Sequence, residues 1–185
     1  MAKDILLDSP LPPWLVEPVI PRILSIPREN NCAGDNVFAG SPHRMPNHVL
    51  VNEYLPGQGI MPHKDGSAYY PVVCTISLGA SLCLEIYGSN EDGAREAQPQ
   101  WRILQEPRSI LITTDDLYTE YLHGIADVAA DVNLSHATVA NWSLLRAPDL
   151  VANGINKRQI RTSLTYRDVL KVSKLGSKLA MLGRR

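Results

Sequence analysis

The sequence predicts a mostly β fold, a sandwich or barrel of the jelly-roll type. From residue 48 onward, short runs rich in Val, Ile, Thr and Tyr recur along the chain. Turn residues such as Pro56-Gly57 and Pro107-Arg108 separate these runs, and the residues before them are Pro-rich and irregular. Many short strands with turns between them are typical of two-sheet all-β folds.

The N-terminal segment, residues 1–46, is expected to be irregular with a little helix. A Pro-Pro-Trp run at residues 12–14 is a pattern that opens a short helix, and Pro18 and Pro21 should interrupt it. Residues 28–46 are rich in Asn, Gly, Asp, Ser and Pro, which predicts a loop.

Most of the core, residues 47–168, is expected to be strand. The predicted strands span residues 48–55, 71–79, 81–87, 101–106, 109–114, 120–125 and 159–166. The runs 101–106 and 109–114 should pair as a hairpin across the turn between them. The polar, acidic stretch 88–98 should be an exposed loop.

One connection in the core is unusually long. Residues 126–156 separate the last two predicted strands, and residues 137–145 within them are expected to be partly helical. The connection is too long for a hairpin turn, so it should be either functional or mobile. A basic C-terminal tail, residues 169–185, follows the core.

The composition is that of an ordinary globular domain. The 185 residues are 44% hydrophobic and 20% charged, and no apolar run approaches the ~18 residues of a membrane span. The N-terminus lacks the basic and apolar regions of a secretion signal. Cys32, Cys74 and Cys83 are odd in number and form no CxxC pair, which favours reduced thiols. We therefore expect a cytoplasmic or nuclear protein, monomeric by default, with no membrane partner.

Basic charge is concentrated at the C-terminal end. From Lys157 onward the chain has nine Lys and Arg residues against Asp168 alone, although its formal net charge is only -1. A basic end of this kind can follow the phosphates of a nucleic acid. The alternative is a solvated tail, with two of its arginines used elsewhere.

The step His63-Lys64-Asp65, with a separate His123, predicts a metal site. In a strand, alternate residues share a face, so His63 and Asp65 should point together and Lys64 away. Two His and one carboxylate leave three open positions on an octahedral ion, which suits Fe(II) that also holds a 2-oxo acid and O2. His123 lies in an apolar run and is the candidate third ligand; the alternative is a core histidine bonded to a backbone carbonyl.

Arg161 and Arg167 are six residues apart and should share a face of the last strand. Buried guanidinium groups are costly unless anions meet them, and a dicarboxylate co-substrate and Asp65 would supply such anions. Arginine suits a bidentate carboxylate contact. The alternative is an exposed basic strand end.

The order and spacing of these residues resemble the AlkB-type Fe(II)/2-oxoglutarate dioxygenases, and residues 47–125 look most like the AlkB homologue six subfamily. The matching elements are Asn52-x-Tyr54, His63-x-Asp65, His123 and Arg161-x5-Arg167. The resemblance implies a double-stranded β-helix in which three residues hold the iron: His63, Asp65 and His123.

The resemblance also implies a catalytic division of labour around 2-oxoglutarate. Arg161, with Tyr54, would bind the distal carboxylate of this co-substrate. Asn52 and Arg167 would lie toward its keto-acid end and toward Asp65. Only 51 residues precede Asn52, so part of the family's substrate lid is expected to be missing.

By the same resemblance the protein hydroxylates a substrate C–H, with an N-alkylated base in DNA or RNA as the expected target. Hydroxylation of an N-methyl group would release succinate, CO2 and formaldehyde. Two alternatives remain open: an oxygenase that acts on protein, and a non-catalytic module that binds nucleic acid or another partner while retaining the metal site.

Overall fold

The computed structural model of the protein describes residues 5–27, 35–90 and 93–173. The chain forms two compact units. The first contains residues Met1–Val49, Gly66–Cys74 and Tyr166–Arg185, and the second contains Leu50–Asp65 and Thr75–Thr165. The predicted boundaries after residues 46 and 168 stay a prediction.

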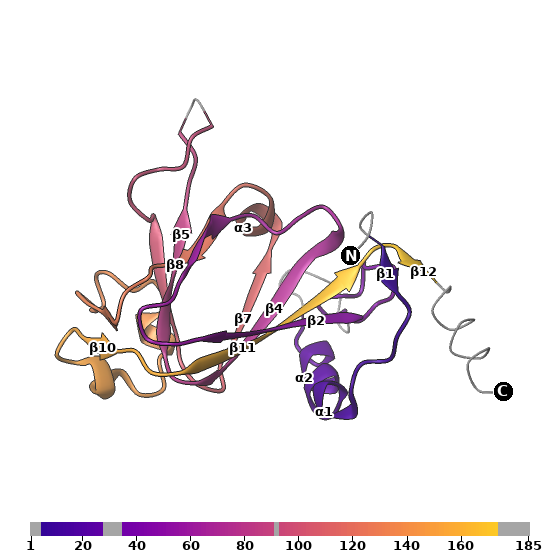
Figure 1. Ribbon diagram of the computed structural model, residues 1–185, viewed down its shortest axis with the longest axis horizontal. Coiled ribbons are helices and arrows are strands. Elements are labelled where there is room, and N and C mark those ends of the chain that lie inside the picture. The colour runs from indigo at the N-terminus through magenta and orange to yellow at the C-terminus, as the bar shows by residue number, and fades with distance from the viewer. Residues whose placement is uncertain (1–4, 28–34, 91–92, 174–185) are drawn as a thin grey trace. The chain divides into compact units, whose positions relative to one another are not determined.

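Two four-stranded sheets and two pairs of short strands make up the described fold (Figure 1). One has the order β2 (His48–Tyr54), β11 (Arg161–Val169), β4 (Tyr69–Gly79) and β7 (Ile110–Thr114). The other has the order β3 (Ile60–His63), β8 (Leu122–Ile125), β5 (Leu82–Tyr87) and β6 (Trp101–Gln105). Because the chain distributes eight strands between two sheets in the jelly-roll order, the predicted double-stranded β-helix is confirmed.

The predicted hairpin between residues 101–106 and 109–114 is wrong. Strand β6 pairs with β5, with Leu82 opposite Gln105, whereas β7 belongs to the other sheet. The backbone N–H of Arg108 donates to the carbonyl of Ser77, so the turn carries the chain across to the next sheet. Strand-like composition on both sides of a turn does not show which partner each strand will choose.

The helical segments also differ from expectation. Helices α1 (Pro13–Val16) and α2 (Val19–Leu24) are separated near Pro18 as predicted, but Pro21 lies inside α2. It is tolerated because the first N–H groups of a helix have no partner within the helix. The short helix α3 (Asp115–Thr119) was not predicted.

Within the second unit, the space between its strands is filled by apolar side chains. Leu82, Leu84 and Ile86 alternate along β5 and pack with Ile125 of β8, and residues including Tyr54 of β2 and Leu111 of β7 complete this cluster. The alternation therefore defines an inner face of the β3–β8–β5–β6 sheet.

The long connection 126–156 packs on the outer face of this sheet. Its residues Leu134, Val139 and Val151 cluster with Cys83 of β5 and Leu104 of β6. It contains the short strand β9 (Ala130–Asp131), which pairs with β10 (Asn156–Lys157), a strand that begins at the last residue of the connection. Its helical turns are the 3-10 segments η1 (Trp142–Leu144) and η2 (Pro148–Val151), so the predicted helix at 137–145 is present only as one short turn.

Polar groups fix the connection to the strands. The side chain of Asn141 accepts a hydrogen bond from the backbone N–H of Leu104 and donates to its carbonyl, each at 2.9 Å. The backbone N–H of Ala140 donates to the carbonyl of Arg102 at 2.8 Å. Strand β6 stands at the end of its sheet, so residues 140 and 141 satisfy backbone groups that no strand pairs.

The first unit contains α1, α2 and the ends of several strands. Strand β1 (Leu6–Leu7) pairs in parallel with β12 (Val172–Ser173). The fully buried carboxylate of Asp168 lies 2.6 Å from Nδ1 of His43, and the hydroxyl of Tyr166 donates to the carbonyl of Leu15. Most of the predicted basic tail, with Lys174 and Lys178, lies outside the described residues. In the described part of the chain, no helix has the length and apolar character needed to cross a membrane.

Candidate active site

Strands β3 and β8 bring two histidines together. They pair in antiparallel register with His63 directly opposite His123. The ring centroids are 4.5 Å apart and the ring planes are tilted by 53°. Since His123 is also opposite Ile86 of β5, both imidazoles belong to the inner face of the sheet.

A β-bulge sets this register. Ile60 pairs with Ile125 and His63 with His123, so β3 has one more residue than β8 between the two pairs. At the bulge, a Cβ atom on Gly124 would lie 2.9 Å from the backbone of Pro62. Residue 124 is therefore glycine because another backbone approaches it closely.

Asp65 does not lie on the strand that carries His63. Strand β3 ends at His63, so the prediction that one strand holds both residues is wrong. The carboxylate still reaches the histidines, with Oδ2 of Asp65 3.8 Å from Nε2 of His123. The Lys64 side chain points away from the histidines, as predicted. Its ammonium donates to the carbonyl of Thr119 at 2.8 Å.

The tautomer of His63 suits a metal ligand. Its Nδ1 lies 2.8 Å from the carbonyl oxygen of Met61. A carbonyl can only accept, so Nδ1 carries the proton and Nε2 presents its lone pair. Metal-ligating histidines commonly have their second ring nitrogen fixed in this way.

The distance between two of the donors can be compared with that in a metal site. Two donor atoms about 2.1 Å from one ion are at most about 4.2 Å apart, and about 3.0 Å when they occupy neighbouring octahedral positions. The 3.8 Å between Asp65 and His123 lies between these limits. Among the described residues, no three His, Cys, Asp or Glu side chains converge tightly enough to hold an ion already. The donor set, two imidazoles and one carboxylate, fits a metal in its chemistry.

Arg161 begins β11 and is only 2% exposed. Its Nε and Nη2 donate to the hydroxyl of Ser77, at 3.2 and 2.8 Å, and Nη2 also donates to Oε1 of Gln105 at 2.6 Å. The guanidinium lies 5.6 Å from the centre of the Tyr54 ring. Burial lowers the pKa of Arg161 to about 10; Tyr54 opposes this change and the charge of Arg158 adds to it.

All hydrogen-bonding partners of Arg161 in the described part of the chain are neutral. No described carboxylate forms an ion pair with it. A buried cation without a counter-charge is costly. The charge of Arg161 therefore has no counter-charge among the described residues.

Asn52 and Tyr54 occupy alternate positions on β2, as predicted, and so share a face. Nδ2 of Asn52 is 3.5 Å from the hydroxyl of Tyr54. Both residues line a cleft of about 360 Å³ together with Gln58 and Gly59, among others. This cleft belongs wholly to the second unit.

Arg167 lies in the first unit and is also buried. Its guanidinium stacks over the ring of Tyr69, 4.8 Å from the ring centre. Burial, and then the charge of Arg167, lower the pKa of His48. The predicted relation between Arg167 and Asp65 stays a prediction.

Two residues of this site were not predicted, Ser77 and Gln105. Each is a polar residue in a run that reads as a buried strand, Thr-Ile-Ser-Leu for Ser77 and Arg-Ile-Leu-Gln for Gln105. That position was an available signal, because a buried polar side chain needs a partner. The identity of the partner, Arg161, emerges only from the pairing of strands that are far apart in the sequence.

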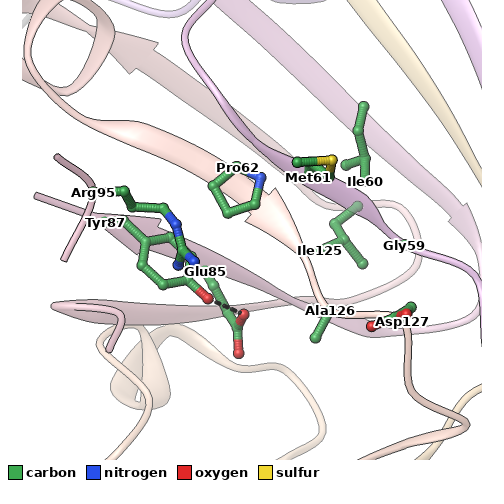
Figure 2. A pocket seen from close by; sticks show the side chains of 10 residues that line it. All are labelled: Gly59, Ile60, Met61, Pro62, Glu85, Tyr87, Arg95, Ile125, Ala126 and Asp127. Atoms are coloured by element: carbon green, nitrogen blue, oxygen red, sulfur yellow. Dashed lines mark hydrogen bonds between the residues drawn. The ribbon is translucent and has the colours of Figure 1, made fainter. Parts of the chain in front are cut away.

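A second cavity lies beside β3, β5 and β8 (Figure 2). It has a volume of about 390 Å³. The hydroxyl of Tyr87 donates to Glu85 at 2.7 Å, and Arg95 stacks over the Tyr87 ring at 4.6 Å, so these three lining side chains interact with one another. Burial, together with the hydrogen bond to Glu85, raises the pKa of Tyr87 to about 12. Glu85 is paired with Gly124 and so faces away from His123.

The sequence also matches a known enzyme superfamily. The family model described as the 2OG-Fe(II) oxygenase superfamily matches residues 19–167, which is most of the chain. The protein therefore belongs to the 2OG-Fe(II) oxygenase superfamily.

Curated relatives place the chain within this superfamily. It is 35% identical over 173 residues to "Probable RNA/DNA demethylase ALKBH6" of Danio rerio, which covers 90% of this chain and 66% of the relative. This confirms the resemblance to AlkB homologue six. It is 30% identical over 127 residues to "Uncharacterized protein L905" of Acanthamoeba polyphaga mimivirus, covering 68% of this chain and 50% of the relative.

The name of a third relative gives a tRNA methyltransferase activity. This is "tRNA (carboxymethyluridine(34)-5-O)-methyltransferase alkbh8" of Xenopus tropicalis, 31% identical over 126 residues, which cover 67% of this chain and 18% of the relative. The chain thus spans less than two thirds of the length of each of these relatives.

Proposed function

We propose that the protein is an Fe(II)- and 2-oxoglutarate-dependent dioxygenase that oxidises an N-alkylated base in DNA or RNA. The observation that carries this proposal is the presence of two features in one unit. Two imidazoles and a carboxylate lie close together, and a buried arginine has only neutral partners. The first combination suits iron and the second suits a dicarboxylate.

In this proposal the iron is held by His63, Asp65 and His123. Bound Fe(II) would supply the chemistry by which O2 converts 2-oxoglutarate to succinate and CO2 and hydroxylates an N-methyl group of the substrate. The resulting N-hydroxymethyl group would then release formaldehyde and leave N–H. The protein's own contribution is to fix the ligands. The carbonyl of Met61 holds the His63 ring in the required tautomer, and the β3–β8 pairing holds the two rings together.

Arg161 would bind the distal carboxylate of 2-oxoglutarate. Its guanidinium is held in place by Ser77 and Gln105 before any ligand arrives, which reduces the entropy lost on binding. Tyr54 lies beside it. The roles of Asn52 and Arg167 toward the keto-acid end rest on the family resemblance.

The choice of a nucleic acid as substrate is supported by the relatives. The name of the Danio rerio relative gives RNA and DNA, and that of the Xenopus tropicalis relative gives tRNA. A nuclear or cytoplasmic location and a monomeric state are parts of the same proposal.

Succinate formation tests the proposal. The protein is incubated with Fe(II), ascorbate, 2-oxoglutarate and O2, beside the variants His63→Ala and His136→Ala. His136 is an exposed residue of the 126–156 connection and serves as a matched control. Succinate that requires iron, and that only His63→Ala abolishes, would support the proposal; equal succinate from all three proteins would refute it.

The substrate is tested separately by the release of formaldehyde. N-methylated DNA, N-methylated RNA and methylated peptides are supplied in parallel. Release from a nucleic acid alone supports the proposal, and release from peptides alone would point instead to a protein-directed oxygenase. Tight, salt-sensitive binding of nucleic acid without succinate from any substrate would identify a binding module.

A further inference from the structure

Gln105 ends strand β6 at a buried position of the second unit. It pairs with Leu82 of β5, and since residues directly opposite share a face, its side chain is on the inner face with Leu82, Leu84 and Ile86. It is 3% exposed. The inner face also carries His63 and His123, so Gln105 belongs to the same interior as the candidate metal ligands.

The orientation of the Gln105 amide follows from its partner. Nη2 of Arg161 lies 2.6 Å from one end of this amide. Every nitrogen of a guanidinium is a donor, so the group that faces Arg161 must be the carbonyl oxygen. The amide nitrogen, Nε2, is then directed away from the guanidinium, with two N–H donors.

Those two donors have no partner among the described residues. The one described hydrogen bond of the Gln105 side chain is accepted by its oxygen, from Arg161. Nη1 of Arg161 also has no hydrogen-bond partner among the described residues. Neither nitrogen is among the buried side-chain atoms that are sealed from solvent without a hydrogen bond. Both nitrogens therefore keep a little accessible surface.

We propose that Gln105 is a specificity-determining residue for dicarboxylates, and that its Nε2 donates a hydrogen bond to the carboxylate that Arg161 binds. The proposal rests on the proposed function, because it deepens the recognition of 2-oxoglutarate. A neutral amide and a cation joined by one hydrogen bond form a two-point donor. Such a donor favours an acid with a second carboxylate over one that ends in a methyl group.

The test compares two 2-oxo acids of equal chain length. 2-Oxoglutarate ends in a carboxylate, and 2-oxovalerate ends in a methyl group at the same position. Calorimetry under anaerobic conditions, with Mn(II) in place of iron, measures the Kd of each acid without any turnover. The variants are Gln105→Glu and Gln105→Met, with Gln98→Glu, at an exposed residue, as the control for the added charge.

Gln105→Glu places a carboxylate against Arg161. It should raise the Kd of 2-oxoglutarate at least about tenfold, because the new carboxylate occupies the arginine and repels the ligand. Gln105→Met removes the two N–H donors and should raise the Kd of 2-oxoglutarate about fivefold. The Kd of 2-oxovalerate should stay within about twofold in both variants. Gln98→Glu should bind both acids like the wild type.

The outcomes separate the two proposals. If the wild type binds 2-oxoglutarate and both Gln105 variants bind it equally well, the role of Gln105 is refuted and the proposed function stands. An equal rise in the Kd of 2-oxoglutarate and of 2-oxovalerate would also refute the role of Gln105, since the effect would not depend on the distal carboxylate. If the folded wild type binds no 2-oxoglutarate, the proposed function fails and this inference fails with it. Thermal unfolding of each variant shows that it is folded, and Gln105→Met covers the case in which Gln105→Glu does not fold.

Discussion

Nη2 of Arg158 lies 2.6 Å from a carboxylate oxygen of Asp131, and both side chains are almost completely buried. Asp131 belongs to the 126–156 connection, whereas Arg158 stands three residues before Arg161 in the sequence. Asp131 also accepts a hydrogen bond from Asn156, and Arg158 donates to the carbonyl of Ala126. The pair thus joins both ends of the connection to the chain that leads into β11.

Asp131→Asn should destabilise the protein strongly, because it leaves the Arg158 charge buried without a counter-charge. We expect a loss of about 3–5 kcal/mol in the free energy of unfolding, measured by urea titration. Asp149→Asn, at an exposed acid of the same connection, should change it by less than about 0.5 kcal/mol. The double variant Asp131→Leu/Arg158→Met should recover much of the loss, and a double variant as unstable as Asp131→Asn would contradict the explanation.

Gly124→Ala should disturb the pairing of β3 with β8. The new methyl group would lie 2.9 Å from backbone atoms of Pro62, so one strand must shift. We expect a loss of about 1–3 kcal/mol in stability, together with weaker Mn(II) binding by calorimetry. Gly66→Ala is the matched control, since glycine 66 also follows a candidate metal ligand but a Cβ there meets no atom within 4 Å. Similar effects of the two substitutions would argue against the bulge as the cause.

Ser77→Ala should loosen Arg161 without removing its charge. The substitution deletes the hydroxyl that accepts from Nε and Nη2. We expect the KM for 2-oxoglutarate to rise about tenfold with kcat changed less than twofold, since the arginine remains but is held by Gln105 alone. Steady-state kinetics on Ser135→Ala, at a partly exposed serine of the connection, provide the comparison. A fall in kcat with unchanged KM would be the contrary result.

Cys74 and Cys83 should be unreactive in the folded protein. Burial raises the pKa of each thiol to about 12 from an ordinary value of 9.0. Between pH 9 and about 12 the unfolded chain would lose these protons while the folded protein keeps them, so stability should fall as the pH rises through this range. Mass spectrometry after alkylation at pH 8 should find both residues labelled only in denaturant. Labelling of either one at the same rate in the native protein would show that it is accessible.

Much of the fold could be predicted from the sequence, because strand alternation and turn residues are local signals. The metal-ligand candidates were also recognisable, since His63 and Asp65 are two residues apart and His123 is a histidine in an apolar run. The end of β3 before Asp65 was not predictable in this way. The bulge between Ile60 and His63 was not predictable either, because it is a property of the strand pair.

The pairing of strands explains the remaining differences. The sequence on either side of Pro107-Arg108 predicts two strands but contains nothing that excludes a hairpin. Gln105 gained its significance only when β5, β6 and β11 brought it to Arg161. Contacts between residues far apart in the chain follow from the whole topology, whereas local patterns specify only the elements.

The two hydrogen bonds between the Asn141 side chain and the Leu104 backbone have a consequence for engineering the protein. An unpaired strand edge is a template on which a second molecule can add its own strand, which leads to aggregation. Asn141 and Ala140 occupy that edge of β6 with hydrogen bonds from a single loop. Shortening the 126–156 connection to make a smaller enzyme would therefore expose unpaired backbone groups of β6. The protein's solubility should then fall, even if every residue of the candidate site remained in place.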